Sequence, residues 1–139
     1  MSDPKSREQS LDPEDWAAMR ALGHRMVDDM LGYLEHVRER PIWQPVPGES
    51  RAALRRPLPR TPEGAKHAYG DFVEHVLPYP MGNIHPRFWG WVIGTGTPLG
   101  ALSELLAATM NPNVGGGDHG ATYVEAQVLD WCKEMLGYP

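Results

Sequence analysis

Prolines limit where this chain of 139 residues can form helices. Six of the fourteen prolines fall between Pro41 and Pro62, and each removes a helical N–H donor and fixes its own φ angle. This spacing favours an extended, polyproline-like backbone. Fifteen glycines add turns elsewhere. The sequence therefore predicts separate helices joined by turns and by a proline-rich strap, which we define as residues 41–62.

The first predicted helix carries a long apolar stripe. Asp12 is the expected N-cap, Pro13 the first helical residue, and the stripe lasts to Arg40. Its members recur at spacings of three and four: Trp16, Met19, Leu22, Met26, Val27, Met30, Leu34 and Val37. Such a helix spans about 40 Å, more than a domain of this size needs for its own core. A Met-rich stripe is usually core, but we interpret this one as a surface that packs on a second chain.

Three shorter helices are predicted farther along the chain, over residues 61–78, 99–110 and 122–137. Thr97 is the expected cap of the second of these, while Thr122 and Glu125 have the spacing of a capping box at the start of the last. The intervening glycine-rich run is predicted to be a loop. The expected fold class is mostly α.

Composition and charge exclude several classes of protein. A content of 41% hydrophobic and 22% charged residues is ordinary for a globular chain, and the length suits one domain. The net charge of −5 produces no field that would attract nucleic acid or anionic lipid. No apolar run reaches the roughly 20 residues of a membrane span, and residues 1–11 are expected to be a frayed tail without a secretion signal. We expect a cytoplasmic protein in which the lone Cys132 is a small buried hydrophobe.

One stretch combines bulky recognition groups with flexible backbone. Residues 83–97 contain two tryptophans, a phenylalanine, a histidine and an arginine among three glycines. Large side chains on backbone that can approach a ligand closely suit a pocket wall. On composition alone, a buried aromatic turn that fills a core explains the same residues equally well.

The motifs resemble a known family. The order His85-Pro86-Arg87-Phe88-Trp89-Gly90-Trp91, followed by Thr97-Pro98-Leu99, is similar to a motif of the group II amino-acid decarboxylases, of the aromatic-amino-acid and glutamate type, which use pyridoxal 5'-phosphate (PLP). Residues 23–28, 40–48 and 122–139 also resemble the family's first helix, its proline strap and a later helix. The resemblance covers residues 11–139 and matches about the first quarter to third of a family member.

The resemblance implies a fold and an assembly. Residues 12–84 would form an N-terminal helical dimerisation segment, in which the first helix and the strap contact a second copy. Residues 85–139 would form a pocket-wall loop and helices that open a PLP-dependent transferase fold of the aspartate aminotransferase type I class, whose α/β large domain is absent here.

The resemblance also implies site residues, by ungapped comparison. Those beside substrate and cofactor would be His85, Trp91, Val92, Gly94 and Thr95. Those reaching the neighbouring subunit's pocket would be Asn113, Val114 and Gly115. Substrate preference stays open, because Trp91-Val92-Ile93-Gly94 replaces the family's Tyr-Phe-Pro-Thr.

A PLP enzyme holds its cofactor through a lysine Schiff base. None of Lys5, Lys66 and Lys133 lies in a motif that would bury and desolvate an amine. The family places that lysine, the pyridine-pairing Asp and the phosphate-binding segment beyond the point that matches residue 139. We therefore expect a truncated or split decarboxylase, inactive alone, whose complete form releases CO2 from an L-amino acid. The alternative is a free-standing, non-catalytic helical protein that binds a partner.

Other patterns are weaker. His85, Asp118 and His119 lack the spacing of metal ligands, so no metal site is predicted. Either histidine is able to move a proton, although a hydrogen-bonded structural role is favoured. The glycine run at 115–117 lacks the Lys-[Ser/Thr] of a phosphate-binding loop. Four strap arginines are interpreted as a solvated face rather than an anion site: Arg51, Arg55, Arg56 and Arg60.

Overall fold

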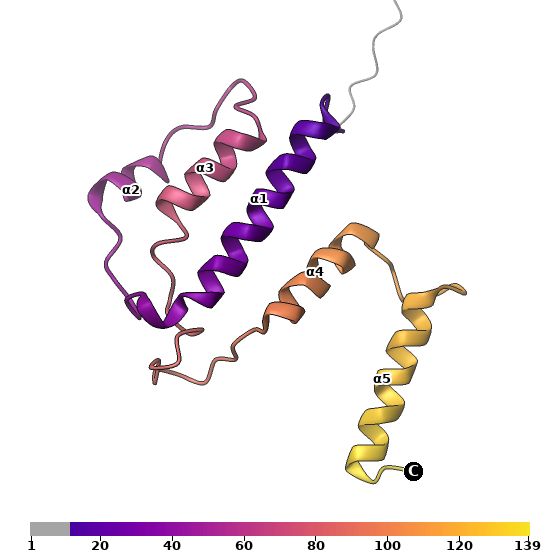
Figure 1. The fold of residues 1–139 in the computed structure, drawn as a ribbon. Coiled ribbons are helices and arrows are strands. Elements are labelled where there is room, and N and C mark those ends of the chain that lie inside the picture. Colours follow the sequence, from indigo (N-terminus) through magenta and orange to yellow (C-terminus); the bar gives the residue numbers. More distant parts are fainter. Residues whose placement is uncertain (1–11) are drawn as a thin grey trace, which may run out of the picture. The chain divides into compact units, whose positions relative to one another are not determined.

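A computed structural model describes residues 12–139 as helices joined by turns and loops (Figure 1). Chain contacts divide it into two compact units, Met1–Thr95 and Gly96–Pro139. The helical elements are α1 (Trp16–Glu35), the 3-10 turn η1 (Val37–Glu39), α2 (Gly48–Ala53), α3 (Ala65–His75), α4 (Pro98–Met110) and α5 (Gly120–Leu136). Residues 12–139 contain no strand, so the prediction of a mostly α chain is confirmed.

Helix α1 is shorter at both ends than the helix predicted from Pro13 to Arg40. The Asp15 carboxylate accepts hydrogen bonds from the backbone N–H groups of Ala17 and Ala18, at 2.9 and 3.0 Å. Asp15 therefore caps the helix, and the prediction of Asp12 as N-cap is wrong. At the other end the backbone tightens into η1 after His36, so α1 spans about 30 Å.

The strap contains a short helix where an extended chain was predicted. Helix α2 occupies a proline-free window that begins directly after Pro47, so its backbone is free to coil. Ser50 of α2 is buried, and its Oγ lies 3.2 Å from Nδ1 of His75. The amide of Gln44 donates to the carbonyl of Pro78 at 2.8 Å. The strap is thus tied to α3 and to the turn that follows it.

Helix α3 begins later than its sequence signal predicts. Glu63 was expected in the first helical turn, but its carboxylate pairs with the Arg56 guanidinium at 2.8 and 3.1 Å. Gly64, at φ +84°, turns the chain into the helix instead. Arg56 also lies 3.0 Å from Asp71, so its charge is satisfied within the first unit. Arg56 is exposed, as a solvated face requires, and it also pairs with these two carboxylates.

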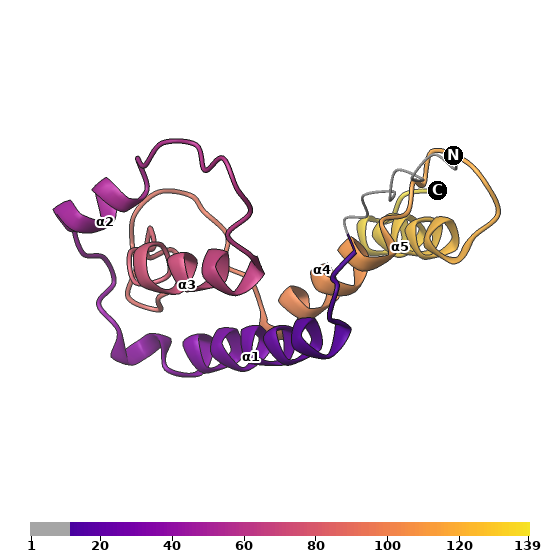
Figure 2. The ribbon, with the colours of Figure 1, turned by 90° about the horizontal axis from the view of Figure 1, so that it is seen from above.

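Helix α3 lies between α1 and α2 (Figures 1 and 2). Its Tyr69 is the one apolar side chain that is buried among residues 12–139. The Tyr69 hydroxyl donates to Asp29 of α1 at 2.8 Å, and the Arg25 guanidinium lies 5.9 Å from the Tyr69 ring. Burial first, and then the hydrogen bond to Asp29, raise the pKa of Tyr69 above its ordinary value. A polar contact, rather than a filled apolar core, joins α1 to α3.

The second unit contains α4 and α5. The Thr97 hydroxyl accepts from the Gly100 N–H at 3.0 Å, which confirms the predicted cap of α4. Asn111 and Gly137 end the two helices in the left-handed conformation. The predicted capping box at Thr122 is wrong, because α5 already begins at Gly120 and Thr122 makes other contacts.

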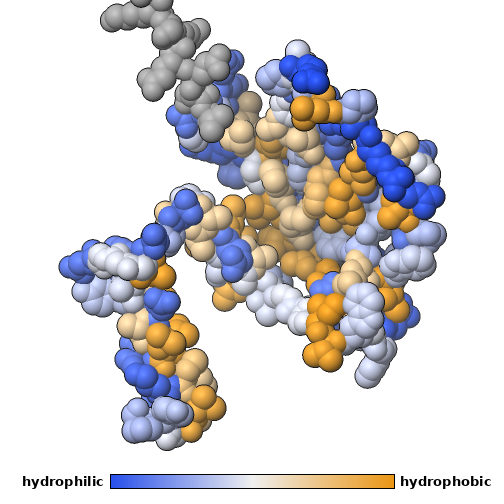
Figure 3. Space-filling model, turned by 180° about the vertical axis from the view of Figure 1, so that it is seen from behind, coloured by the Kyte–Doolittle hydropathy of each residue, from blue (hydrophilic) through white to orange (hydrophobic). Residues whose placement is uncertain are grey.

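The apolar faces of α4 and α5 are bare. Leu106 and Met110 of α4 are 65% and 70% exposed, and Met135 of α5 is 77% exposed. Cys132 is also exposed, so its predicted burial is wrong. Figure 3 shows hydrophobic surface in orange on both units, including along α5. Contiguous exposed apolar surface of this kind is typical of interaction sites.

Candidate functional site

An apolar groove runs between α1 and α3. Its main hollow has a volume of about 610 Å³. Met19, Leu22, Met26 and Met30 of α1 face Tyr69 and Phe72 of α3 across it, and we call these six residues the α1–α3 groove. The four α1 residues belong to the predicted stripe. The stripe therefore lines a groove that α3 fills only in part.

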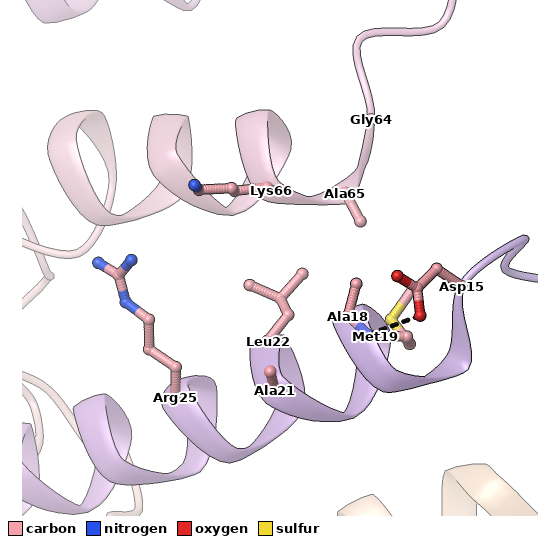
Figure 4. A pocket seen from close by; sticks show the side chains of 9 residues that line it. All are labelled: Asp15, Ala18, Met19, Ala21, Leu22, Arg25, Gly64, Ala65 and Lys66. Carbon is pink, nitrogen blue, oxygen red and sulfur yellow. Dashed lines mark hydrogen bonds between the residues drawn. The ribbon is translucent and has the colours of Figure 1, made fainter.

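A second hollow of about 520 Å³ opens at the beginning of both helices (Figure 4). Leu22 and Arg25 point from α1 toward α3, and Ala65 points back toward α1. The Asp15 carboxylate lies at the edge, where it already caps α1. Met19, Leu22 and Ala65 line both hollows, so the two form one apolar surface with charged groups at one end.

His85 lies buried beneath the aromatic stretch, with only 4% of its surface exposed. Its Nδ1 accepts the Arg87 backbone N–H at 3.0 Å, so the neutral ring carries its proton on Nε2. The His85 N–H donates to the Gly82 carbonyl, and its carbonyl accepts from the Phe88 N–H, both at 2.9 Å. Two successive turns are thus built around this imidazole. The buried His85 thus holds the backbone of this stretch in place instead of projecting from it.

The side chains that follow His85 project into solvent. Trp89 and Trp91 are 93% and 76% exposed, so the alternative of a buried aromatic turn is wrong for both. Val92 is fully exposed, and Gly94 and Thr95 are exposed as well. Trp91 has φ +52°, a left-handed conformation that costs a non-glycine residue on the order of 1 kcal/mol. Strained backbone conformations of this kind are found most often at active sites and ligand-binding segments.

Gly82 fixes where the strap crosses this stretch. It has φ +96°, and a Cβ atom placed on it would collide with the backbone carbonyl of Ile42. Any other residue would push the strap away. At the far end, the Asn83 amide donates to the Gly94 carbonyl at 3.2 Å and closes the stretch into a loop. From the sequence alone, Gly82 indicates only that a helix ends nearby. Its close approach to Ile42 was therefore not predicted.

The glycine-rich loop of the second unit is ordered by its own side chains. Asn113 Oδ1 accepts the Gly115 N–H at 2.8 Å, so this side chain turns back onto its own loop. His119 Nε2 lies 3.0 Å from the Asn113 carbonyl and 3.2 Å from the Thr122 hydroxyl. Val114 is left 40% exposed. His119 and Thr122 were not predicted as members of this cluster, since their contacts form only when the loop closes.

A tyrosine and an aspartate stand beside this loop. The Tyr123 hydroxyl donates to the Asp118 carboxylate at 2.6 Å, and this hydrogen bond raises the pKa of Tyr123 above its ordinary value. Asp118 is therefore already engaged at the start of α5. Within residues 12–139, no group of three or more His, Cys, Asp or Glu residues has the arrangement of a metal site.

The lysines of the described residues do not fit a Schiff base with PLP. Lys66 is exposed in the first turn of α3. Lys133 is exposed on α5, and its Nζ lies 3.2 Å from Asp130. A Schiff-base lysine needs a buried or electrostatically tuned amine. Neither lysine among residues 12–139 therefore has the surroundings of a Schiff-base lysine.

None of the helices in the described part of the chain is both long and apolar enough to cross a membrane.

Comparison with known proteins gives consistent relatives. The chain is 30% identical to tryptophan decarboxylase 2 of Oryza sativa subsp. japonica over 136 residues, which is 95% of this chain and 27% of that protein. It is 26% identical to the aromatic-L-amino-acid decarboxylase of Bacillus atrophaeus over 124 residues, 87% of this chain and 26% of the relative. No family model matches the chain. It spans about a quarter of the length of these curated relatives.

A solved structure has the same fold over this part. The crystal structure of Oryza sativa TDC with PLP and tryptamine matches 94% of this chain and 27% of its own, with a TM-score of 0.71 and 23% sequence identity. The chain is thus similar to amino-acid decarboxylases in sequence over nearly its whole described length, and it has the fold of the matching part of one of them.

Proposed function

We propose that this chain supplies the dimer interface and part of the substrate-pocket wall of a PLP-dependent amino-acid decarboxylase. The complete enzyme would release CO2 from an L-amino acid. One observation carries the proposal: residues 12–139 bury a single apolar side chain of their own, although they resemble decarboxylases almost throughout. A chain that leaves its helices uncovered requires a larger body to bury them.

The α1–α3 groove supports the homodimer. It is apolar, and Met19 and Met26 remain 39% and 42% exposed in it. A second copy of α1 would present the same stripe to it, as a two-fold interface requires. The strap would wrap that second copy, since its Trp43 is 64% exposed. Methionines adapt their shape and suit such an interface.

The pocket wall is the stretch that His85 supports. Trp91 and Val92 would offer an apolar face to the substrate side chain, with Gly94 and Thr95 beside them. The names of the relatives include tryptophan, tyrosine and histidine decarboxylases. In the neighbouring subunit's pocket, the loop of Asn113, Val114 and Gly115 would contribute mainly the Val114 side chain, because the Asn113 carbonyl and amide oxygens are both engaged.

The cofactor would be held by residues outside 12–139. When bound, PLP withdraws electrons from the substrate carbon that loses the carboxylate. This chain would orient the substrate and exclude water from one side of the pocket. His85 would support this wall from within, since it is buried with Nδ1 engaged, while its Nε2 has no hydrogen-bond partner among the described residues.

The experiment is to read the gene downstream of codon 139 and to produce whatever polypeptide it encodes together with this chain. We expect a PLP-containing assembly that releases CO2 from an L-amino acid, and no release from the 139-residue chain alone. A gene without a PLP-binding continuation, in this frame or an adjacent one, would instead favour the non-catalytic partner-binding protein.

A further inference from the structure

We propose that His119 is a positioning residue for the loop of residues 113–117. Its imidazole lies at the start of α5 and bonds back across the loop to Asn113, at the loop's beginning. This inference rests on the proposed function in one respect, namely that the loop enters the neighbouring subunit's pocket. The hydrogen bonds themselves stand on the geometry of the second unit alone.

The direction of these hydrogen bonds follows from the chemistry of the partners. The Asn113 carbonyl can only accept, so His119 Nε2, 3.0 Å away, must carry the proton and donate. The Thr122 hydroxyl oxygen, 3.2 Å from the same nitrogen, is a second acceptor. The Thr122 hydroxyl in turn donates to the Gly117 carbonyl at 3.4 Å. The His119 Nε2–H thus links the beginning of the loop, at Asn113, to the first turn of α5. Thr122 links that turn to the end of the loop, at Gly117.

The loop needs such a tie because of its composition. Three consecutive glycines follow Val114, and ordering each backbone residue costs roughly 1 to 2 kcal/mol of conformational entropy. The Asn113 side chain orders only the first of them, through the Gly115 N–H. Gly117 has φ +95°, and its position lies against the His119 ring. Without the imidazole, the glycines would be free to move the Val114 side chain.

His119 would therefore act on the pocket through Val114. Val114 is the residue of this loop with an exposed apolar side chain, and its place depends on where the glycines turn. No contact between His119 and substrate is required. The role predicts that a side chain with a donor at the same reach can replace the imidazole, whereas a ring without a donor cannot.

The test uses three variants of the full 139-residue chain, followed by nuclear magnetic resonance. His119→Phe keeps a ring and removes the donor, His119→Gln keeps an N–H donor, and Thr122→Val removes the hydroxyl at constant shape. The backbone order parameters of residues 114–117 should be near 0.85 in the unchanged chain and in His119→Gln. They should fall below about 0.6 in His119→Phe and to an intermediate value in Thr122→Val.

Ring nitrogen shifts give the second readout, since neutral His119 should carry its proton on Nε2. Helical content by circular dichroism is the folding control for α5. A loop that is equally ordered in His119→Phe, or a proton on Nδ1, would overturn the proposal. Loop order that depends on His119, together with no CO2 release from the assembly of this chain with the polypeptide encoded downstream, would refute the proposed function and leave this inference standing.

Discussion

At the residue scale, the tightest steric requirement in the first unit lies at Gly82. Its left-handed φ and its contact with the Ile42 carbonyl together exclude a side chain. Gly94, in the same stretch, has open space around it and an ordinary φ. The two glycines therefore form a matched pair in which only one has a structural reason to be glycine.

We predict that Gly82→Ala destabilises the first unit by about 2 kcal/mol or more, since backbone strain adds to a collision with main-chain atoms. Gly94→Ala should change stability by less than about 0.5 kcal/mol. Urea unfolding followed by tryptophan fluorescence measures both. Equal losses in the two variants would show that Ile42 does not restrict the strap crossing.

The ionisation of Tyr69 should make the stability of the first unit depend on pH, in a direction that follows from its pKa. Its pKa is raised above the ordinary value by burial and by the bond to Asp29, so folding favours the protonated hydroxyl. The stability it contributes is present below the unfolded pKa of about 10 and is lost as pH rises through the folded pKa. We predict that the urea midpoint falls as pH rises above about 10, and that Tyr69→Phe loses this part of the slope. An unchanged slope in the variant would exclude Tyr69 as its source.

At the scale of elements, helix ends with one local capping residue were predictable. Thr97 stands alone at its helix end and caps α4 as predicted, and Gly137 ends α5 at the limit of the predicted range 122–137. Asp12 competed with Asp15, and the sequence does not show which carboxylate reaches the free amides. Thr122 is a residue type suited to capping, but its hydroxyl is engaged by the loop instead. Helix α2 was missed because the contact between its Ser50 and His75 spans 25 residues.

Two glycines, Gly70 within α3 and Gly64 directly before it, test where this helix begins. Gly70 lies inside the helix, exposed, with nothing near an added Cβ, so Gly70→Ala should stabilise the first unit by about 0.5 to 1 kcal/mol. Gly64 turns the chain at φ +84°, so Gly64→Ala should destabilise it by about 1 kcal/mol. Thermal unfolding by circular dichroism compares the pair. A loss in Gly70→Ala would mean that another chain packs against this face of α3.

The candidate site was predictable only as two segments. The aromatic order after His85 and the glycine loop are visible in the sequence, and their resemblance to decarboxylases assigned them to pockets. That His85 lies beneath the stretch, while Trp89 projects from it, depends on how the chain turns at Gly82. These arrangements are non-local, so spacing along the chain does not reveal them.

At the scale of the whole molecule, α1 presents two different faces. Met26 lies in the α1–α3 groove, where a lysine would place a charge against apolar surface. His24 is exposed, and the helical repeat puts it on the opposite side of α1, away from the groove. Substituting lysine at either position adds the same charge to the same helix.

We predict that the chain associates at micromolar concentrations, as bare apolar surface requires, and that Met26→Lys weakens this association by at least tenfold. His24→Lys should leave it unchanged. Sedimentation velocity over a hundredfold range of concentration measures all three proteins, with circular dichroism to show that α1 still forms.

A chain that stays monomeric throughout would refute the proposed homodimer through α1. Equal weakening by both substitutions would mean that net charge, rather than the groove, controls association. Only a loss confined to Met26→Lys identifies the α1–α3 groove as the surface that a second copy covers.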